Sequence, residues 1–200
     1  MLALALMASY LLGSIPTGYL LVKWTKRMDI RTVGSGNIGA TNALRTAGPS
    51  AGFVVLVLDF LKGAMATGLI PRWVLGSSVS GSALACGFAA VVGHDFSCFL
   101  RFRGGKGVAT TLGALFAGAP WVAGMVIGVW LVVFLLFRYV SVGSLAAAVA
   151  IPISQLVAHQ SFPQVLIGSL FAALIIVRHR GNLQRLLSGV EPRARPHTQQ

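Results

Sequence analysis

The chain has 200 residues, of which 56% are hydrophobic and 10% charged, and its mean hydropathy is +0.80. Soluble domains carry about 25% charged residues, so this composition excludes a soluble globular protein and indicates an integral membrane protein. The net charge is +12, but the basic residues are interleaved with apolar runs, which the positive-inside rule explains better than nucleic-acid binding does.

The apolar segments predict an all-α integral membrane protein, a compact bundle of seven transmembrane helices in a single domain. The expected helices cover residues 1–22, 52–70, 80–97, 108–119, 120–137, 143–158 and 163–177. The first has no basic residue before it and no small-residue cleavage pattern, so we expect a retained span rather than a signal peptide. Three cytoplasmic active-site loops, 23–51, 98–107 and 178–191, and a flexible tail, 192–200, complete the expected organisation.

The distribution of basic residues favours a break at Pro120. Fourteen of the sixteen Lys and Arg residues lie in four basic segments: 23–45, 101–106, Arg138 and 178–195. One helix over 108–137 would give six spans, with eight basic residues on one side and seven on the other. Seven spans place fourteen on one side and only Arg72 on the other, as the positive-inside rule requires. The N-terminus is then outside and the C-terminus in the cytoplasm.

The first polar stretch, 34–45, matches the G-x-G-x-x-G pattern, but a transmembrane segment precedes it instead of the strand that a dinucleotide site needs. Its small residues expose consecutive backbone N–H groups, and Arg45 adds a bidentate donor. Neutral donors come from Ser35, Asn37, Thr41 and Asn42. The stretch therefore favours either an oxyanion or phosphate cradle or, as the plainer alternative, a flexible solvated loop.

The second polar stretch places Lys106 among Gly104, Gly105 and Gly107, immediately before an expected helix. Backbone donors and the helix dipole act together at such an N-terminus, which favours anion binding. The pattern is not a Walker A loop, because Gly107 replaces the Ser or Thr that should follow the Lys. A phosphate ligand is therefore expected, and ATP is not. Anchoring of a helix end among lipid headgroups is the alternative for Arg101 and Arg103.

The third polar stretch, 178–191, contains a short amphipathic segment in which Arg185, Leu186 and Leu187 suit anchoring at the membrane interface. His179 and Asn182 are spaced i, i+3, so they share one face of that segment. Because an imidazole titrates near neutral pH, His179 is the natural candidate for a base, and a structural role is the alternative.

The acidic residues form no paired carboxylate site and no cluster with metal-ligand spacing. Asp59 and Lys62 lie one turn apart within the second expected span, where unpaired charge is costly. Mutual neutralisation in the bundle and a direct functional role are both open for this pair. His159 and His197 are expected to be incidental.

The three polar stretches resemble the loops of the bacterial acyl-phosphate:glycerol-3-phosphate acyltransferases, the PlsY family. The resemblance lies in 34–45, 93–112 and 178–191, with supporting segments at 13–20, 59–63 and 138–144. It implies seven membrane helices in the bacterial plasma (inner) membrane, with the active site facing the cytoplasm. It also implies transfer of a fatty acyl group from acyl phosphate to the sn-1 hydroxyl of glycerol 3-phosphate, giving lysophosphatidic acid and phosphate in phospholipid biosynthesis. Asp95 and Ser97 depart from the more usual Asn and Pro, which changes the expected local turn.

The motifs and the resemblance together give the expected site. Catalytic roles are expected for Ser35, Arg45, Lys106, His179 and Asn182. Substrate-binding roles are expected for Gly34, Gly36, Asn37, Thr41, Asn42, Arg103, Gly104, Gly105, Gly107, Ser144 and Glu191. No metal site and no cofactor are expected. The expected partners are the two substrates and the lipid bilayer, without nucleic acid, and the protein is expected to be a monomer.

An acyl phosphate is already an activated mixed anhydride, so direct transfer needs no covalent acyl-enzyme, only orientation of two anionic substrates. We expect Lys106, Arg45 and the amides of 104–107 to hold the leaving phosphate, and Ser35, Asn182 and His179 to position glycerol 3-phosphate. The base is either His179 or the departing phosphate itself. A membrane transporter of a phosphorylated metabolite is the alternative function, although such proteins usually bind near the midplane between two related halves, and no repeat is evident here.

Overall fold

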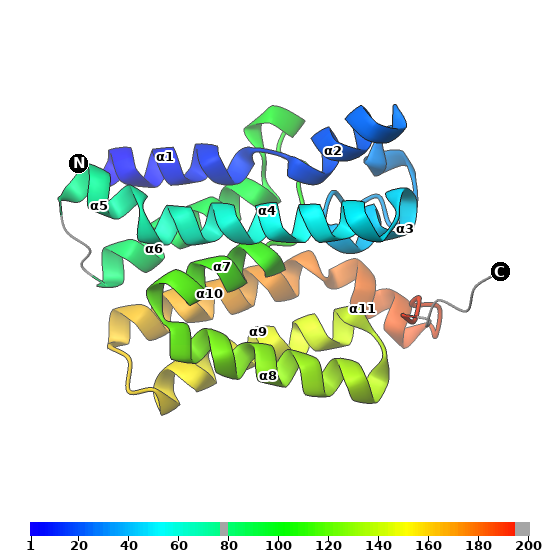
Figure 1. Cartoon of the computed structure of the whole chain (residues 1–200). Coiled ribbons are helices and arrows are strands. Elements are labelled where there is room, and N and C mark those ends of the chain that lie inside the picture. The colour runs from blue at the N-terminus through cyan, green and yellow to red at the C-terminus, as the bar shows by residue number, and fades with distance from the viewer. Residues whose placement is uncertain (77–79, 195–200) are drawn as a thin grey trace. The chain divides into compact units, whose positions relative to one another are not determined.

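The computed structural model describes residues 1–76 and 80–194, and every regular element in these ranges is helical (Figure 1). This confirms the expected all-α class. Arg195 and His197 lie outside the described residues, with the end of the expected tail. The chain separates into two compact units, Met1–Pro120 and Trp121–Gln200. The single domain expected from the sequence stays a prediction.

The first unit contains seven α-helices and two short 3-10 helices within the described residues. They are α1 (Leu2–Ser14), α2 (Thr17–Lys26), η1 (Ile30–Thr32), α3 (Ala40–Ala47), α4 (Pro49–Gly68), α5 (Ile70–Leu75), α6 (Ser80–Asp95), η2 (Cys98–Leu100) and α7 (Val108–Gly118). The helix expected over 1–22 is interrupted at Ile15 and Pro16, because proline has no N–H to continue the helical ladder. The expected loop 23–51 contains η1 and α3, which the sequence reading did not anticipate.

Small residues allow two helix pairs in the first unit to pack with their backbones in close contact. A methyl group added at Gly63 of α4 would collide with the carbonyl of Thr110 in α7, and one at Gly113 would collide with the carbonyl of Phe60. Gly13 of α1 meets the backbone of Ala90 in α6 in the same way. Such contacts are typical of helix packing in membranes, where close approach replaces the hydrophobic effect.

Helix α7 packs against the second half of α4. Thr110 lies beside Gly63, and Gly63 is about 20 Å from the start of α4 at 1.5 Å per residue. The segment 104–107, which leads into α7, is therefore placed near the middle of α4 rather than at its N-terminal end.

The second unit consists of α8 (Pro120–Phe137), α9 (Val140–Val157), α10 (Phe162–Arg178) and α11 (Arg180–Leu187), as far as the chain is described. Ala119 separates α7 from α8, so the chain does break directly before Pro120. Helices α9 and α10 pack against each other. The axis bends by 54° between α10 and α11, at His179.

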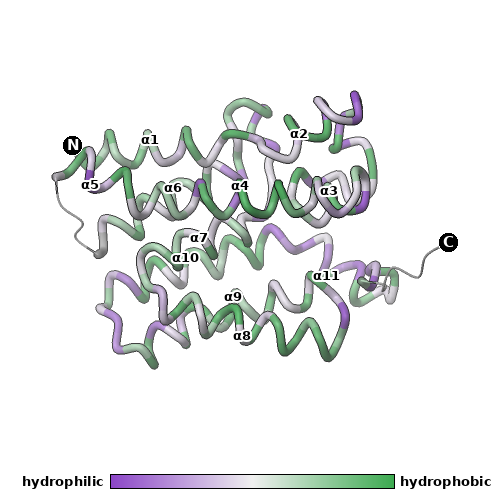
Figure 2. Tube along the Cα trace, viewed as in Figure 1, coloured by the Kyte–Doolittle hydropathy of each residue, from purple (hydrophilic) through white to green (hydrophobic). Residues whose placement is uncertain are grey.

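Among the described residues, five helical segments are long and apolar enough to cross a membrane. They are Leu2–Lys26, Pro49–Leu75, Ser82–Leu100, Pro120–Phe137 and Val140–Val157, and the bent pair α10 and α11 would make a sixth. Figure 2 shows the hydrophobic character of α8 and the hydrophilic residues of the α2–α3 connection. The integral membrane class is confirmed. Helix length alone does not give the expected seven spans, because α7 has 11 residues, about 16 Å, against a hydrocarbon core of about 30 Å.

Candidate active site

Asn42 organises the first glycine-rich stretch. Its side chain is buried, and its Oδ1 accepts a hydrogen bond from the Ser35 backbone N–H at 3.0 Å. Its Nδ2 lies 2.9–3.1 Å from the carbonyls of Ile30, Val33 and Asn37. Gly34 has a φ of +60° and lies so close to Asn42 that an added methyl group would collide with its amide. Because the donors of Asn42 are used within the protein, the geometry supports a structural role for it, and the expected substrate contact stays a prediction.

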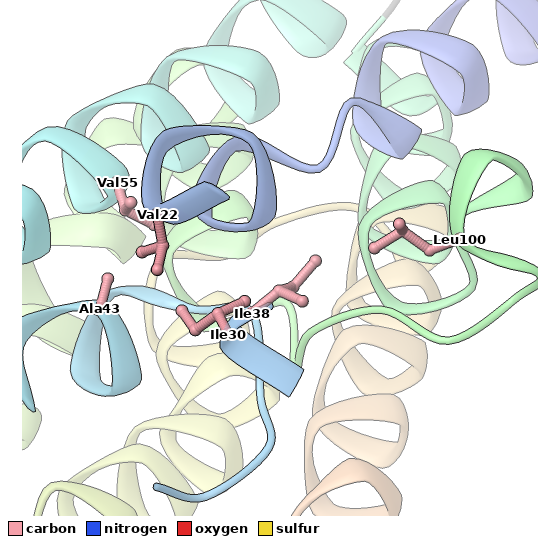
Figure 3. Close-up of a cluster of buried hydrophobic side chains, with 6 residues drawn as sticks. All are labelled: Val22, Ile30, Ile38, Ala43, Val55 and Leu100. Carbon is pink, nitrogen blue, oxygen red and sulfur yellow. The ribbon is translucent and has the colours of Figure 1, made fainter. Parts of the chain in front are cut away.

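The same stretch contributes to a cluster of buried hydrophobic side chains (Figure 3). The cluster consists of Val22, Ile30, Ile38, Ala43, Val55 and Leu100, which come from α2, η1, the first stretch, α3, α4 and η2. It therefore joins the first polar stretch to η2, which directly precedes the second polar stretch. This packing argues against the alternative of a flexible solvated loop for 34–45.

Replacing Asn42 with Ala is expected to lower the stability of the folded protein by about 2 kcal/mol, since several backbone groups lose their partner at once. Thr46→Val on the same helix removes one hydrogen bond, from Thr46 Oγ1 to the Asn42 carbonyl, and serves as the control. Thermal unfolding in detergent, with limited proteolysis of 33–39, measures the effect. An Asn42→Ala protein that unfolds with the control and resists protease equally would contradict the assigned role.

Three of the expected residues of the first stretch present polar groups at the surface of the unit. Ser35 and Arg45 are exposed, and Thr41 is half-buried. Thr41 and Arg45 lie one turn apart on α3, so they share a face. Among the described residues the Arg45 guanidinium has no hydrogen bond or ion pair. It is thus available to an anionic ligand.

The glycine-rich turn, residues 104–107, is folded back onto the end of α6. The Gly104 and Gly105 N–H groups donate to the carbonyls of Asp95 and His94, at 3.1 Å and 2.9 Å. An added methyl group would collide with the His94 carbonyl at Gly104 and with the His94 ring at Gly105, so both positions require glycine. Lys106 is half-buried within this turn, and α7 begins two residues later. Arg103 is exposed beside it.

The turn contacts His94, which belongs to a charge network that we define as Thr17, Asp59, Lys62 and His94. Lys62 Nζ is 2.9 Å from Asp59 Oδ1 and 2.7 Å from His94 Nδ1, and Thr17 Oγ1 donates to Asp59 Oδ1 at 2.5 Å. The exposed fractions of Asp59, Lys62 and His94 are 2%, 4% and 4%. The pairing of Asp59 with Lys62, left open by the sequence, is therefore real and extends to His94.

The third polar stretch belongs to the second unit, where His179 occupies the bend between α10 and α11. The ring is buried, and its Nδ1 lies 2.8 Å from the Ile175 carbonyl. A carbonyl can only accept, so Nδ1 carries a proton, and in the neutral ring Nε2 carries the lone pair. This fixes the tautomer that a general base requires.

Asn182 and Arg185, also in this stretch, both bind Glu191. Asn182 Nδ2 donates to Glu191 Oε1 at 2.6 Å, and Arg185 Nε donates to Oε2 at 2.8 Å. Both carboxylate oxygens of Glu191 are engaged, which supports a role in holding Asn182, and the expected substrate contact stays a prediction. Burial favours the neutral acid, but interactions with Ser141, Asn182 and Arg185 outweigh it and lower the pKa of Glu191.

A pH dependence of stability follows from Glu191. Because its folded pKa lies below its ordinary value of 4.5, the carboxylate contributes stability above pH 4.5 that is lost as the pH falls through the folded pKa. Glu191→Gln should therefore unfold at a lower temperature than the wild type at pH 7, and the difference should shrink below pH 4.5. Unfolding of both proteins in detergent between pH 7 and pH 3 tests this, and a difference independent of pH would contradict it.

Ser144, the remaining expected substrate contact, is buried on α9. Its hydroxyl donates to the Val140 carbonyl at 2.9 Å and lies 3.4 Å from Trp130 Nε1. A serine hydroxyl has a single donor, so Ser144 has none left to donate to a substrate in this arrangement.

The described residues thus include cationic side chains and backbone N–H donors next to the glycine-rich start of α7, in a chain with several helices apolar enough to cross a membrane. A family model described as glycerol-3-phosphate acyltransferase matches residues 3–189. The chain belongs to the glycerol-3-phosphate acyltransferase family. This confirms the resemblance drawn from the sequence.

Several members of this family are similar over nearly the whole chain. The glycerol-3-phosphate acyltransferase 2 of Moorella thermoacetica is 46% identical over 190 residues, covering 94% of this chain and 95% of that protein. The Synechococcus sp. (strain JA-2-3B'a(2-13)) acyltransferase is 47% identical over 193 residues, covering 95% and 93%.

Two solved structures of PlsY, described as an integral membrane glycerol 3-phosphate acyltransferase, share this fold. The glycerol 3-phosphate form has a TM-score of 0.90 and 42% identity, covering 97% of this chain and 96% of that chain. The lysophosphatidic acid form has a TM-score of 0.85 and 40% identity, covering 96% and 94%.

Sequence reasoning assigned no role to His94, although it lies in 93–112, one of the segments that carry the family resemblance. Its partner Lys62 is 32 residues away in the chain, and no local spacing connects the two. The family segment 59–63 and the Gly93–His94 pair were each visible in the sequence, but only the packing of α4 against α6 brings them together.

Proposed function

We propose that the protein transfers a fatty acyl group from acyl phosphate to the sn-1 hydroxyl of glycerol 3-phosphate, releasing phosphate and lysophosphatidic acid. The observation that carries this proposal is membership of the glycerol-3-phosphate acyltransferase family over residues 3–189. The likeness to a PlsY structure in its glycerol 3-phosphate form supports the acceptor. As a member of this family the protein is an enzyme, and the transporter alternative is set aside.

The glycine-rich turn is the proposed site of the acyl-phosphate leaving group. Lys106 and the start of α7 place positive charge and backbone donors together, where the helix dipole adds to them. Negative charge grows on the phosphate as the acyl–oxygen bond breaks, so donors at this position stabilise the transition state more than the ground state. Arg45, exposed and without a protein partner among the described residues, is proposed as the second cation.

Ser35, His179 and Asn182 are the proposed ligands of glycerol 3-phosphate. His179 has its Nδ1 proton committed to the Ile175 carbonyl, so the neutral ring offers the Nε2 lone pair as an acceptor for the sn-1 hydroxyl proton. The departing phosphate is the alternative acceptor. The hydrogen bond from Asn182 to Glu191 fixes the orientation of the Asn182 amide before a substrate binds. The glycines at 34, 36, 104, 105 and 107, together with Asn37, Thr41 and Arg103, are proposed to line the substrates.

The transfer is proposed to be direct, without an acyl-enzyme. An acyl phosphate is activated before it binds, so positioning the hydroxyl against the carbonyl carbon supplies most of what the reaction needs. The hydroxyl oxygen of glycerol 3-phosphate forms the new ester bond as the bond to phosphate breaks, and the phosphate leaves with the electron pair. No metal or cofactor has a role in this proposal.

The proposed topology keeps seven spans, with the N-terminus outside, the C-terminus in the cytoplasm and the polar stretches on the cytoplasmic side of a bacterial inner membrane. Helix α7 begins beside the middle of α4, so it needs to cross only the remaining part of the membrane. Non-helical backbone at that depth occurs in proteins where it is buried or lines a water-filled cavity, which suits a binding turn. The protein is proposed to act as a monomer.

A reporter fused after Gln200 is expected to be active only on the cytoplasmic side, because seven spans with an external N-terminus end inside. The same reporter fused before Met1 is the control and should report the external side. Activity of the C-terminal fusion outside the inner membrane would contradict the seven-span topology.

The donor is tested with the purified protein in detergent and labelled glycerol 3-phosphate. Palmitoyl phosphate should give labelled lysophosphatidic acid, while palmitoyl-coenzyme A, which presents a thioester in place of the acyl phosphate, should give at least about 100-fold less, the scale of losing an oxyanion contact. Product from the thioester alone would overturn the proposed donor, and no product from either would overturn the proposed function.

A further inference from the structure

We propose that the buried charge network, Thr17, Asp59, Lys62 and His94, positions the glycine-rich turn for the acyl donor without touching either substrate. This inference rests on the proposed function, because it takes 104–107 to be the cradle of the acyl phosphate. It assigns His94 and Lys62 as positioning residues.

The ammonium group of Lys62 is fully occupied within the protein. It has three N–H donors, and three acceptors surround it: Asp59 Oδ1 at 2.9 Å, His94 Nδ1 at 2.7 Å and the Ile15 carbonyl at 3.2 Å. The Ile15 carbonyl is accessible because the helix is interrupted at Pro16. Lys62 therefore has no donor left for a phosphate, which argues against a direct role for it in binding.

The same geometry orients the ring of His94. Its Nδ1 faces the Asp59–Lys62 pair, 2.7 Å from Lys62 Nζ and 3.5 Å from Asp59 Oδ1, and a charged Lys62 donates its hydrogen bond to this nitrogen. With Nδ1 directed to Lys62, the Nε2 edge faces Gly105, where an added methyl group would collide with it. The ring is thus clamped between the ammonium group on one side and the turn on the other.

Two further contacts connect the network to the glycine-rich turn and to α2. The His94 carbonyl accepts from the Gly105 N–H at 2.9 Å, so ring and backbone of one residue both set the place of the turn. Thr17, which donates to Asp59, is the first residue of α2, and the next residue, Gly18, is in close contact with the Ile38 carbonyl of the first stretch. The direct contacts of the network are with the glycine-rich turn, through His94, and its link to the first stretch is indirect, through α2.

Stability alone is a poor explanation for this network. A buried ion pair contributes little net stability, because removing two charges from water costs about as much as their attraction returns, and apolar replacements of similar volume are often tolerated. What apolar side chains do not supply is a fixed ring orientation. A displacement of about 1 Å in a substrate-positioning element is enough to cost on the order of 100-fold in rate.

The test compares binding parameters for the two substrates across variants. The double variant Asp59→Asn with Lys62→Met removes the charges together, and His94→Leu removes the acceptor while Lys62 keeps its charge. His94→Asn retains an acceptor near the Nδ1 position. Thr67→Val, which alters a buried hydroxyl elsewhere on α4, is the matched control. Each protein is measured for unfolding temperature, for kcat and for the KM of palmitoyl phosphate and of glycerol 3-phosphate.

We expect the double variant and His94→Leu to raise the KM of palmitoyl phosphate by about tenfold or more, with a much smaller change for glycerol 3-phosphate. His94→Asn should recover part of this loss, and Thr67→Val should match the wild type. A double variant that unfolds with the wild type and keeps its palmitoyl phosphate KM would overturn the inference, as would an equal rise in both KM values. If the double variant or His94→Leu does not fold, His94→Asn decides: a KM indistinguishable from Thr67→Val overturns the inference. A wild type inactive with palmitoyl phosphate would instead defeat the proposed function.

Discussion

Lys106→Met is expected to lower kcat/KM for palmitoyl phosphate by about 10²–10³-fold, the range seen when one donor to a developing negative charge is removed. The side chain is half-buried in the glycine-rich turn, two residues before α7, where its charge and the helix start act on the same group. Methionine keeps the length and apolar stem of lysine, so the turn should be preserved and only the charge lost.

Two variants frame the Lys106 measurement. Lys106→Arg keeps the charge in a different geometry and should retain part of the activity, because a guanidinium and an ammonium present their donors differently. Lys26→Met removes an exposed charge at the end of α2 and should behave as the wild type. If Lys106→Met stays within threefold of Lys26→Met, about 0.7 kcal/mol, then Lys106 does not hold the leaving phosphate.

His179→Ala is expected to lower kcat by about 10²–10⁴-fold if the ring is the general base. The ring is buried at the bend between α10 and α11, with Nδ1 bound to the Ile175 carbonyl, so its orientation is set before any substrate arrives. Loss of the ring should therefore affect kcat more than the KM of palmitoyl phosphate. His159→Ala, an exposed histidine between α9 and α10, is the matched control.

The His179 result also separates the two candidate bases. If His179→Ala retains most of its kcat, the departing phosphate accepts the hydroxyl proton, and the ring is reduced to a positioning role. A variant that loses kcat but regains it with added imidazole would assign the proton transfer to the ring, because the free base fills the vacated space.

The membrane character and the break at Pro120 were predictable because they depend on composition and on local rules. Apolar runs, basic stretches and a proline act within a few residues of where they stand. The glycines at 104, 105 and 107 were predictable for the same reason, although the sequence could not show that the first two are required by contact with His94. The spacing of the glycines around Lys106 predicts the turn, and the contacts with His94 explain why two of them are needed.

The roles of Asn42 and His94 were not predictable, because they depend on groups distant in the chain. Asn42 was expected to contact substrate, since an exposed-looking Asn in a glycine-rich stretch has the same sequence pattern whether its amide faces a ligand or the backbone. Its hydrogen bonds to the carbonyls of Ile30, Val33 and Asn37 support a role in holding the backbone, and the substrate contact stays a prediction. The contacts of Glu191 with Asn182 and Arg185 were likewise not evident from the sequence.

Direct transfer is tested most closely by isotope exchange between labelled inorganic phosphate and palmitoyl phosphate in the absence of glycerol 3-phosphate. A covalent acyl-enzyme would release phosphate before the acceptor binds, so reversal of that step would carry label into palmitoyl phosphate. Direct transfer predicts no label in palmitoyl phosphate and no palmitoyl group bound to the protein under these conditions. Rapid exchange, with palmitate recovered on the wild type but not on Ser35→Ala, would contradict the account and make Ser35 a nucleophile.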